Sequence, residues 1–156
     1  MADFQPVVFS LDEERYGMDI SYVNGIESEQ QIVRVPNASR NIKGIINLRG
    51  EVIPVMNLRA KFNTPNQEPP EETELMIINL PGNKLALEVD GVEQIHHISE
   101  ENMVDMPMIA QGEGVKYFDK VAKVDDKLII LINPLELLSD DERKAVEKLT
   151  EEKTDN

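Results

Sequence analysis

Residues 43–58 read KGIINLRGEVIPVMNL, and this stretch decides the fold. It holds two short runs rich in Ile and Val, residues 44–48 and 51–56, which are typical of β-strands. Between the runs stands the pair Arg49-Gly50, where glycine can keep a turn tight because it adopts backbone angles that other residues avoid. The stretch therefore predicts a β-hairpin that presents Arg49 at its tip.

Runs of the same kind follow one another along most of the chain. Near the N-terminus, an apolar run, a charged turn and an alternating run predict a first hairpin. Little helix is predicted between the runs, a spacing typical of antiparallel sandwiches and barrels, so the predicted fold is all-β. The predicted strands are residues 7–11, 15–20, 32–35, 44–48, 51–56, 75–80, 84–89, 92–98, 115–124 and 127–132.

The chain also contains a weak internal repeat. Residues 23–27 recur as residues 89–93, and residues 50–58 line up with residues 126–135 when one inserted proline is allowed. Two copies of the same order of elements predict two similar small barrels in tandem, with an approximate division at the proline-rich connection of residues 63–73. Chance similarity between short apolar strings is the competing explanation.

Helix is predicted in two places, as a short piece after Asn57 and from residue 140 to about residue 152. Ser139 stands three residues before Glu142, which is the pattern of a capping box at a helix N-terminus. Residues 1–138 are thus predicted to form one domain of two sub-barrels, and residues 139–156 an acidic C-terminal helix and tail. The apolar side of that helix is expected to dock on a barrel through Leu138, Ala145, Val146 and Leu149.

Composition limits the partners and the location of the chain. Its net charge of −14, from 30 acidic and 16 basic residues, opposes binding to nucleic acid and to anionic membranes. Cysteine is absent, which excludes disulfides and thiolate sites, and no signal segment opens the chain. Every apolar run is far shorter than the roughly 20 residues that span a bilayer. We therefore expect a cytoplasmic protein that neither binds nucleic acid nor inserts into a membrane.

The sequence lacks the usual motifs of catalysis, phosphate binding and metal binding. His96 and His97 are the only histidines, and adjacent residues on a strand point to opposite faces, so this pair is not expected to share a metal ion. Acidic runs such as residues 12–14 and 125–126 are expected in solvated turns. No catalytic residue, cofactor or metal is predicted, although an enzyme that uses scattered carboxylates stays open as an alternative.

The central stretch resembles the signature of CheW-like domains, which is a strand, an Asn-Leu-Arg-Gly turn and a second strand with a proline. Upstream, residues 14–20 and 32–36 are similar to the opening hairpin and the next strand of that family. Downstream, residues 87–92 and 128–133 are similar to its second half. The resemblance spans roughly residues 4–138 and leaves only the acidic tail outside.

This resemblance implies two five-stranded, SH3-like (OB-like) barrels with short helices after the barrel strands, a hydrophobic contact between the barrels, and strands that cross from one to the other. It also implies a non-enzymatic scaffold of bacterial chemotaxis. One barrel face would bind the CheW-like regulatory domain of the histidine kinase CheA. A groove between the barrels would accept the helical hairpin tip of a chemoreceptor, and neither contact needs a cofactor.

Arg49 is the residue most expected to contact a partner, because a guanidinium at a hairpin tip presents a planar fork to a carboxylate or to carbonyl groups. Pairing of Arg49 with Glu51 or another surface carboxylate is the alternative. Several apolar positions would mark a binding groove if they are exposed together, although each one alone is expected in the core. The predicted partner-binding residues are Arg49, Gly50, Leu48, Asn47, Gly44, Val23, Ile26, Val33, Ile45, Val92 and Ile95.

Two other functional classes stay open. A CheW-like regulatory module of a larger signalling protein would have the same fold, but the chain starts at Met1 and no kinase or receiver segment is expected in it. A small-barrel nucleic-acid binder of the OB type needs basic and aromatic residues on one sheet face. The charge of −14 and the absence of Trp argue against that binder.

Overall fold

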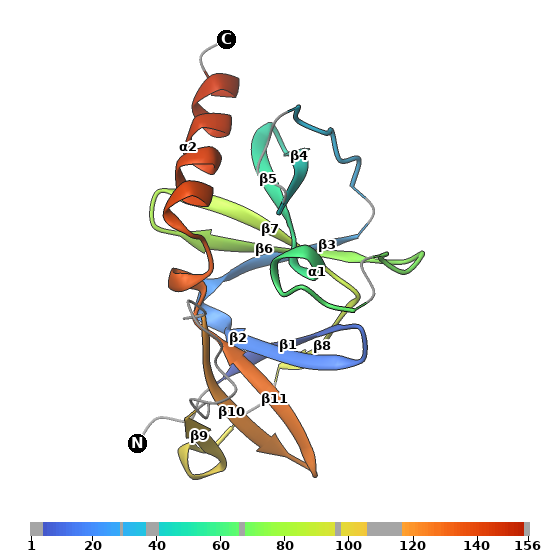
Figure 1. Ribbon diagram of the computed structural model, residues 1–156, viewed down its shortest axis with the longest axis vertical. Coiled ribbons are helices and arrows are strands. Elements are labelled where there is room, and N and C mark those ends of the chain that lie inside the picture. The colour runs from blue at the N-terminus through green and yellow to red at the C-terminus, as the bar shows by residue number, and fades with distance from the viewer. Residues whose placement is uncertain are drawn as a thin grey trace.

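Two β-sheets make up most of the computed structural model, which describes residues 5–28, 30–36, 41–65, 68–95, 98–105 and 117–154 (Figure 1). A six-stranded sheet has the order β8-β1-β2-β11-β10-β9, and a five-stranded sheet has the order β3-β6-β7-β5-β4. The strands are β1 Pro6–Leu11, β2 Glu14–Asp19, β3 Val23–Ser28, β4 Ile42–Leu48, β5 Glu51–Asn57, β6 Glu74–Leu80, β7 Asn83–Val89, β8 Gly91–Ile95, β9 Met103–Asp105, β10 Phe118–Val124 and β11 Lys127–Ile132.

The prediction of an all-β fold is confirmed, with three local differences. β3 was expected only as part of the repeat, and the three-residue β9 adds a sixth strand to one sheet. Residues 32–35 do not form a full strand, because only Val33 pairs, in a single antiparallel bridge with Ile45. The histidine pair His96-His97 lies outside the described residues.

Each sheet combines strands from both halves of the chain. β1 and β2 lie with β8 to β11, whereas β3, β4 and β5 lie with β6 and β7. The chain therefore crosses between the sheets at two places, at the 3-10 helix η1 (Ile20–Tyr22) and at the single residue Asp90 between β7 and β8. The connection of residues 63–73 leads to β6, and β5 and β6, on its two sides, both belong to the five-stranded sheet.

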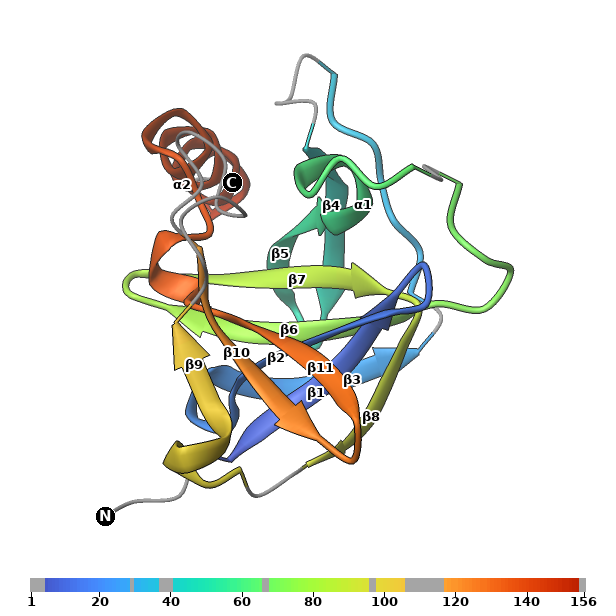
Figure 2. The same cartoon turned by 60° about the horizontal axis from the view of Figure 1, so that its bottom comes forward.

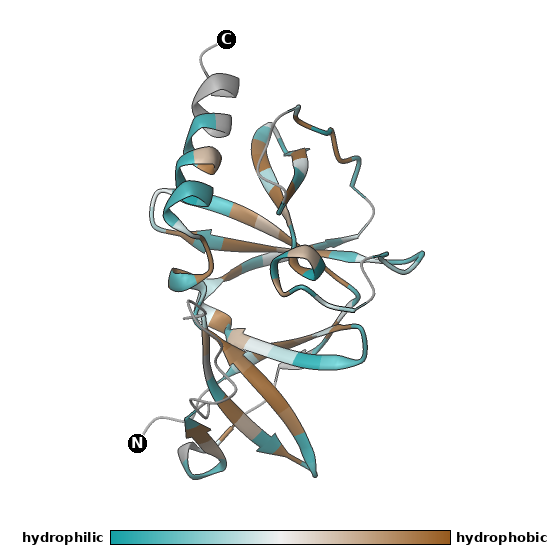
Figure 3. Cartoon of the chain, in the orientation of Figure 1, coloured by the Kyte–Doolittle hydropathy of each residue, from teal (hydrophilic) through white to brown (hydrophobic). Residues whose placement is uncertain are grey.

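The largest hydrophobic core lies between the two sheets, and each sheet has a second core on its other face. Alternation along β6 shows this arrangement, since Met76 and Ile78 belong to the core between the sheets whereas Leu75 and Ile77 belong to the core of the five-stranded sheet. Burying one such side chain stabilises the fold by roughly 1.5–3 kcal/mol. Hydrophobic colours accordingly run along β11 in Figure 3.

Aromatic side chains gather at one end of the core between the sheets. Tyr16 of β2 stacks on Phe9 with the ring centroids 5.8 Å apart and lies 5.1 Å from Phe62, which follows helix α1 (Leu58–Lys61). Tyr117 and Phe118 complete this group. Burial, followed by the charge of Glu14, raises the pKa of Tyr16 to about 12. The Tyr16 ring therefore packs as a neutral phenol at physiological pH.

The repeat predicted from the sequence has a counterpart in matching turns of the two halves. After β5, the side chain of Asn57 accepts a hydrogen bond from the backbone N–H of Ala60 (3.3 Å), which caps α1. After β11, Asn133 accepts one from Leu135 (3.1 Å) and so caps the 3-10 helix η4 (Pro134–Glu136). Both halves thus end a strand with the same asparagine cap, since Asn side chains readily satisfy free N–H groups at helix starts.

Helix α2 (Asp140–Thr154) follows the six-stranded sheet but packs against β5 of the other sheet. The predicted capping box is present, because Ser139 and Glu142 exchange hydrogen bonds of 2.9 and 3.1 Å. Glu142 also accepts hydrogen bonds from Asn41 (2.7 Å) and Lys61. Leu138 and Val146 are buried, as predicted, so the helix fastens the two sheets to each other.

Glu142 should make the free energy of unfolding depend on pH below about pH 4.5, near the ordinary carboxyl pKa. Burial alone would raise the pKa of Glu142, but hydrogen bonds from Lys61, the Ser139 backbone and Asn41 outweigh burial and lower it. A carboxyl whose pKa is lowered on folding gives stability that is complete above the unfolded pKa and is lost as pH falls through the folded value. Urea unfolding at a series of acidic pH values should show a shallower loss of stability for Glu142→Gln than for the wild type. Equal slopes would contradict this role.

Candidate functional site

An apolar groove lies where the edges of the two sheets meet. It is bounded by β3, an edge strand of the five-stranded sheet, and by β8, an edge strand of the six-stranded sheet. Figure 2 shows β8 along one margin of its sheet, beside β1. The groove has a volume of about 480 Å³, and its lining includes Val7, Ile20, Val23, Gly25, Ile26 and Val92. It thus brings together three of the predicted partner-binding residues, Val23, Ile26 and Val92.

A β-bulge in β3 places Val23 and Ile26 on the same side of the strand. These residues are three apart in the chain, so a regular strand would point them to opposite faces. The register shifts between Val23 and Gly25, and Val23 pairs with Ile78 while Ile26 pairs with Met76. Ile78 and Met76 both belong to the core between the sheets. One extra residue in β3 therefore turns Ile26 toward the groove.

β8 contains a matching irregularity. Val92 pairs with Phe9 and Ile95 pairs with Val7, and the register shifts between these pairs. Val92 packs against the core between the sheets. The side chain of the predicted residue Ile95 lies outside the described residues. Both walls of the groove are thus edge strands with a shifted register, which is how edge strands often aim a side chain at a functional site.

The remaining predicted apolar residues differ in how much of each is exposed to solvent. Ile26 and Val33 are 42% and 53% exposed, and both are available to a partner. Ile45 is buried, and Gly44 is buried where the chain approaches closely, because a Cβ on Gly44 would lie only 2.3 Å from the carbonyl oxygen of Val33. Gly44 and Ile45 therefore pack inside the fold, and partner contact by either one stays a prediction.

The predicted turn at Arg49 is a two-residue hairpin loop between β4 and β5. Arg49 and Gly50 have φ angles of +52° and +86°, the combination found in tight hairpin turns. Asn47 fastens the loop, because its side-chain oxygen accepts the N–H of Gly50 at 3.0 Å. Leu48 packs against the core of the five-stranded sheet. Three of the predicted residues, Asn47, Leu48 and Gly50, therefore hold the turn that presents Arg49.

The guanidinium of Arg49 faces a carboxylate and open solvent. Its Nη2 lies 3.6 Å from Oε2 of Glu27, and the Arg49 side chain is 76% exposed. Arg49 thus forms a surface ion pair, as the alternative prediction had it, but with Glu27. Glu51 instead pairs with Lys84 at 3.0 Å. Such an exposed pair is worth about 0–1 kcal/mol, so it leaves Arg49 free to meet another carboxylate.

Glu27 connects the turn to the groove. It follows Ile26 directly on β3, so Arg49 contacts the strand that carries the groove residue Ile26, although the side chains of Ile26 and Glu27 point to opposite faces of that strand. β3 and β4 are the opposite edges of the five-stranded sheet. The contact of Arg49, in the turn after β4, with Glu27 of β3 brings these edges together, and Val33, in the segment after β3, bridges to Ile45 of β4. Arg49 therefore lies where the two edges of the sheet approach each other.

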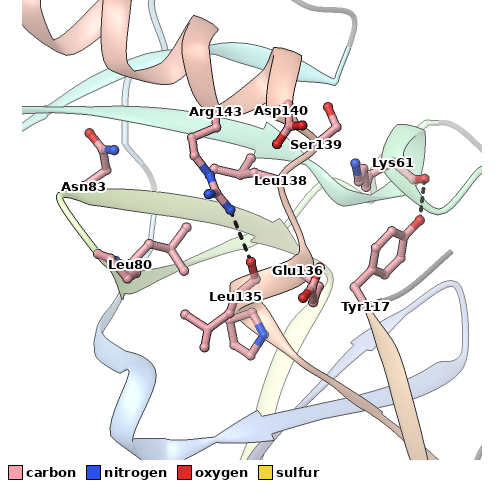
Figure 4. Close-up of a pocket in the computed structure, with 12 residues that line it drawn as sticks. Lys61, Leu80, Asn83, Tyr117, Leu135, Glu136, Leu138, Ser139, Asp140 and Arg143 are labelled. Carbon is pink, nitrogen blue, oxygen red and sulfur yellow. Dashed lines mark hydrogen bonds between the residues drawn. The ribbon is translucent and has the colours of Figure 1, made fainter. Parts of the chain in front are cut away.

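A second cavity, of about 580 Å³, lies between helix α2, η4 and the turn that joins β6 to β7 (Figure 4). Arg143 donates a hydrogen bond to the carbonyl of Leu135 across it (3.4 Å), and the Tyr117 hydroxyl donates to the carbonyl of Lys61 (3.4 Å). Burial, followed by the charge of Glu142, raises the pKa of Tyr117. These bonds tie α2 and its neighbours together, which is a structural role.

The described residues also bear on metal sites and on membrane-spanning helices. Within those residues, no group of three or more His, Asp or Glu side chains lies together in a way that would hold a metal ion. None of the helices described there has both the length and the apolar character needed to cross a membrane.

Comparison with known proteins gives one consistent result. Residues 5–142 match the family described as CheW-like domain. The chemotaxis protein CheW of Treponema pallidum is 30% identical over 150 residues, which cover 94% of this chain and 88% of that protein. The chemotaxis protein CheW of Klebsiella aerogenes is 29% identical over 143 residues, which cover 92% of this chain and 86% of that protein.

A solved structure agrees with these relatives. The crystal structure of the scaffolding protein TtCheW from Thermoanaerobacter tengcongensis superposes with a TM-score of 0.82 at 33% identity. The match covers 90% of this chain and 95% of that chain. The similarity therefore extends over the whole arrangement of two sheets.

Proposed function

Because the chain belongs to the CheW-like domain family, we propose that it is a non-catalytic chemotaxis scaffold that couples chemoreceptors to the histidine kinase CheA in the cytoplasm. The groove between the two sheets would receive the helical hairpin tip of a receptor. A face of one barrel away from the groove would bind the CheW-like regulatory domain of the kinase. The protein would then act by holding two partners in one complex.

The observation that carries this proposal is the joining of Val23, Ile26 and Val92 in one apolar groove at the meeting of the two sheets. A helical partner that binds in a groove buries a stripe of apolar side chains, and charged groups at the rim fix its orientation. Arg49 contacts Glu27, the chain neighbour of the groove residue Ile26 on β3, and most of the Arg49 side chain is exposed. A carboxylate next to the apolar stripe of the receptor helix would complete the match.

Two substitutions test the groove and its rim separately. Ile26→Asp places a charge in the apolar groove, and Arg49→Glu reverses the charge beside it. Both side chains are exposed, so both variants should fold with nearly wild-type stability. Calorimetric titration against a soluble receptor hairpin fragment should show a loss of affinity of at least about tenfold for each variant, which corresponds to roughly 1.4 kcal/mol.

Val104→Asp is the matched control, because Val104 is 48% exposed and lies on β9, outside the groove. It should bind the receptor fragment as the wild type does. Titration of the same four proteins against the kinase regulatory domain should show binding by the wild type and by both groove variants. Failure of the wild type to bind either partner would overturn the scaffold proposal.

A further inference from the structure

One wall of the groove begins where the chain crosses between the sheets. β7 ends at Val89 in the five-stranded sheet and β8 begins at Gly91 in the six-stranded sheet, so Asp90 alone makes the crossover. Val92, which lines the groove, stands two residues further on. The direction in which β8 leaves the crossover therefore determines where this wall of the groove lies.

Asp90, the crossover residue, is held in place by hydrogen bonds to three other parts of the fold. The N–H of Asp90 donates to the carbonyl of Ser10 at 3.0 Å. Its Oδ2 accepts hydrogen bonds from the N–H of Asp12 at 2.7 Å and from Arg59 at 2.6 Å. Arg59 is buried in α1. Asp90 is thus fixed to β1, to the first hairpin turn and to α1.

Glu74 holds the residues that follow the crossover. Its Oε1 accepts the N–H of Val92 at 3.0 Å, and a Cβ built on Gly91 would lie 4.0 Å from the same oxygen. The carboxylate therefore lies against the backbone of Gly91 and Val92. Glu74 belongs to β6, so this hydrogen bond joins the five-stranded sheet to the groove strand of the six-stranded sheet.

The hydrogen bond between Glu74 and the Val92 N–H has the chemistry expected of a contact that holds β8 in place. β8 is an edge strand, and edge strands carry backbone N–H groups that no neighbouring strand accepts. A carboxylate acceptor makes a stronger hydrogen bond to such a group than a neutral oxygen does. Because the partly buried contact spans two sheets, it restrains the distance between Val92 and the five-stranded sheet.

We propose that Glu74 is a positioning residue for the receptor-binding groove and acts through the backbone of Val92. This inference rests on the function proposed above, and it adds a residue that lies on neither wall of the groove. Without the Glu74 carboxylate, the start of β8 can move away from the five-stranded sheet. The apolar walls of the groove would then no longer stand at one fixed separation.

Three variants separate the hydrogen bond from the charge. Glu74→Gln keeps an oxygen that can accept the Val92 N–H but removes the charge. Glu74→Ala removes both, and Glu71→Ala removes a charge from an exposed position on the same cavity lining as Glu74. Hydrogen exchange of the Val92 amide should speed up in Glu74→Ala by about tenfold or more and stay within about threefold of wild type in the other two variants.

Affinity for the receptor hairpin fragment should follow the same order. Glu74→Ala should bind about tenfold more weakly, while Glu74→Gln and Glu71→Ala should bind within about twofold of wild type, and all four proteins should bind the kinase domain equally. Unchanged receptor affinity in a Glu74→Ala variant whose Val92 amide exchanges faster would overturn the positioning role, as would unchanged exchange. If the wild type itself binds no receptor fragment, the proposed function is wrong, and Val92 exchange still decides whether Glu74 holds the crossover.

Discussion

Gly44→Ala should lower the free energy of unfolding by about 3 kcal/mol or more, although it adds only one methyl group. The new Cβ would meet the carbonyl oxygen of Val33 at 2.3 Å, a backbone atom that cannot rotate away. The two segments would have to separate, and two backbone hydrogen bonds of 2.8 Å between Val33 and Ile45 would be lost or stretched. Overpacking costs roughly 1–3 kcal/mol and each lost hydrogen bond about 1 kcal/mol. Urea unfolding measures the difference directly.

Gly25→Ala is the control for this prediction. Gly25 is also in a strand, but a Cβ built there meets no atom within 4 Å. Its free energy of unfolding should stay within about 0.5–1 kcal/mol of wild type. If the two alanine variants unfold at the same urea concentration, the close approach of Val33 does not prevent a larger side chain at position 44.

Arg59→Ala should be similarly damaging, with an expected loss of about 3–5 kcal/mol in the free energy of unfolding. The Arg59 side chain is 5% exposed, and its Nη2 lies 2.6 Å from the carboxylate of Asp90, which is 18% exposed. Removal of the guanidinium leaves a largely buried carboxylate without its main counter-charge. Thermal or urea unfolding should show a clear drop in the midpoint.

Lys84→Ala provides the comparison for an ion pair in solvent. Lys84 and Glu51 are 3.0 Å apart, but their side chains are 33% and 51% exposed. An exposed pair of this kind contributes about 0–1 kcal/mol. A result in which Arg59→Ala costs no more than Lys84→Ala would show that water compensates the charge of Asp90 despite its burial.

Local patterns in the sequence predicted the strands, the hairpin at Arg49 and the capping box of α2, because each depends on residues close together in the chain. The Arg49-Gly50 turn follows from the conformational freedom of Gly50, and the capping box follows from the spacing of Ser139 and Glu142. The candidate groove residues Val23, Ile26 and Val92 were also named from the sequence, by similarity to a known family.

Local sequence patterns could not predict the contacts between segments that lie far apart in the chain. The bulge that turns Ile26 to the same side as Val23 depends on pairing with β6, which lies some fifty residues further along the chain. The contact of Glu74 with Val92 likewise requires two different sheets to meet. The close approach of Val33 to Gly44 also could not be predicted, because nothing near Gly44 in the sequence reveals it.

The exchange of strands between the two halves has a consequence for synthesis of the protein in the cell. The hairpin of β1 and β2 is completed first, but its neighbours β8 and β11 end at Ile95 and Ile132. At about 5–20 residues per second, the ribosome needs on the order of ten seconds to make the rest of that sheet. During this interval, the core that buries Phe9, Leu11 and Met18 in the final fold is incomplete, because β11 has not yet been made. We therefore expect the nascent chain, rather than the finished scaffold, to be the form that aggregates and engages chaperones.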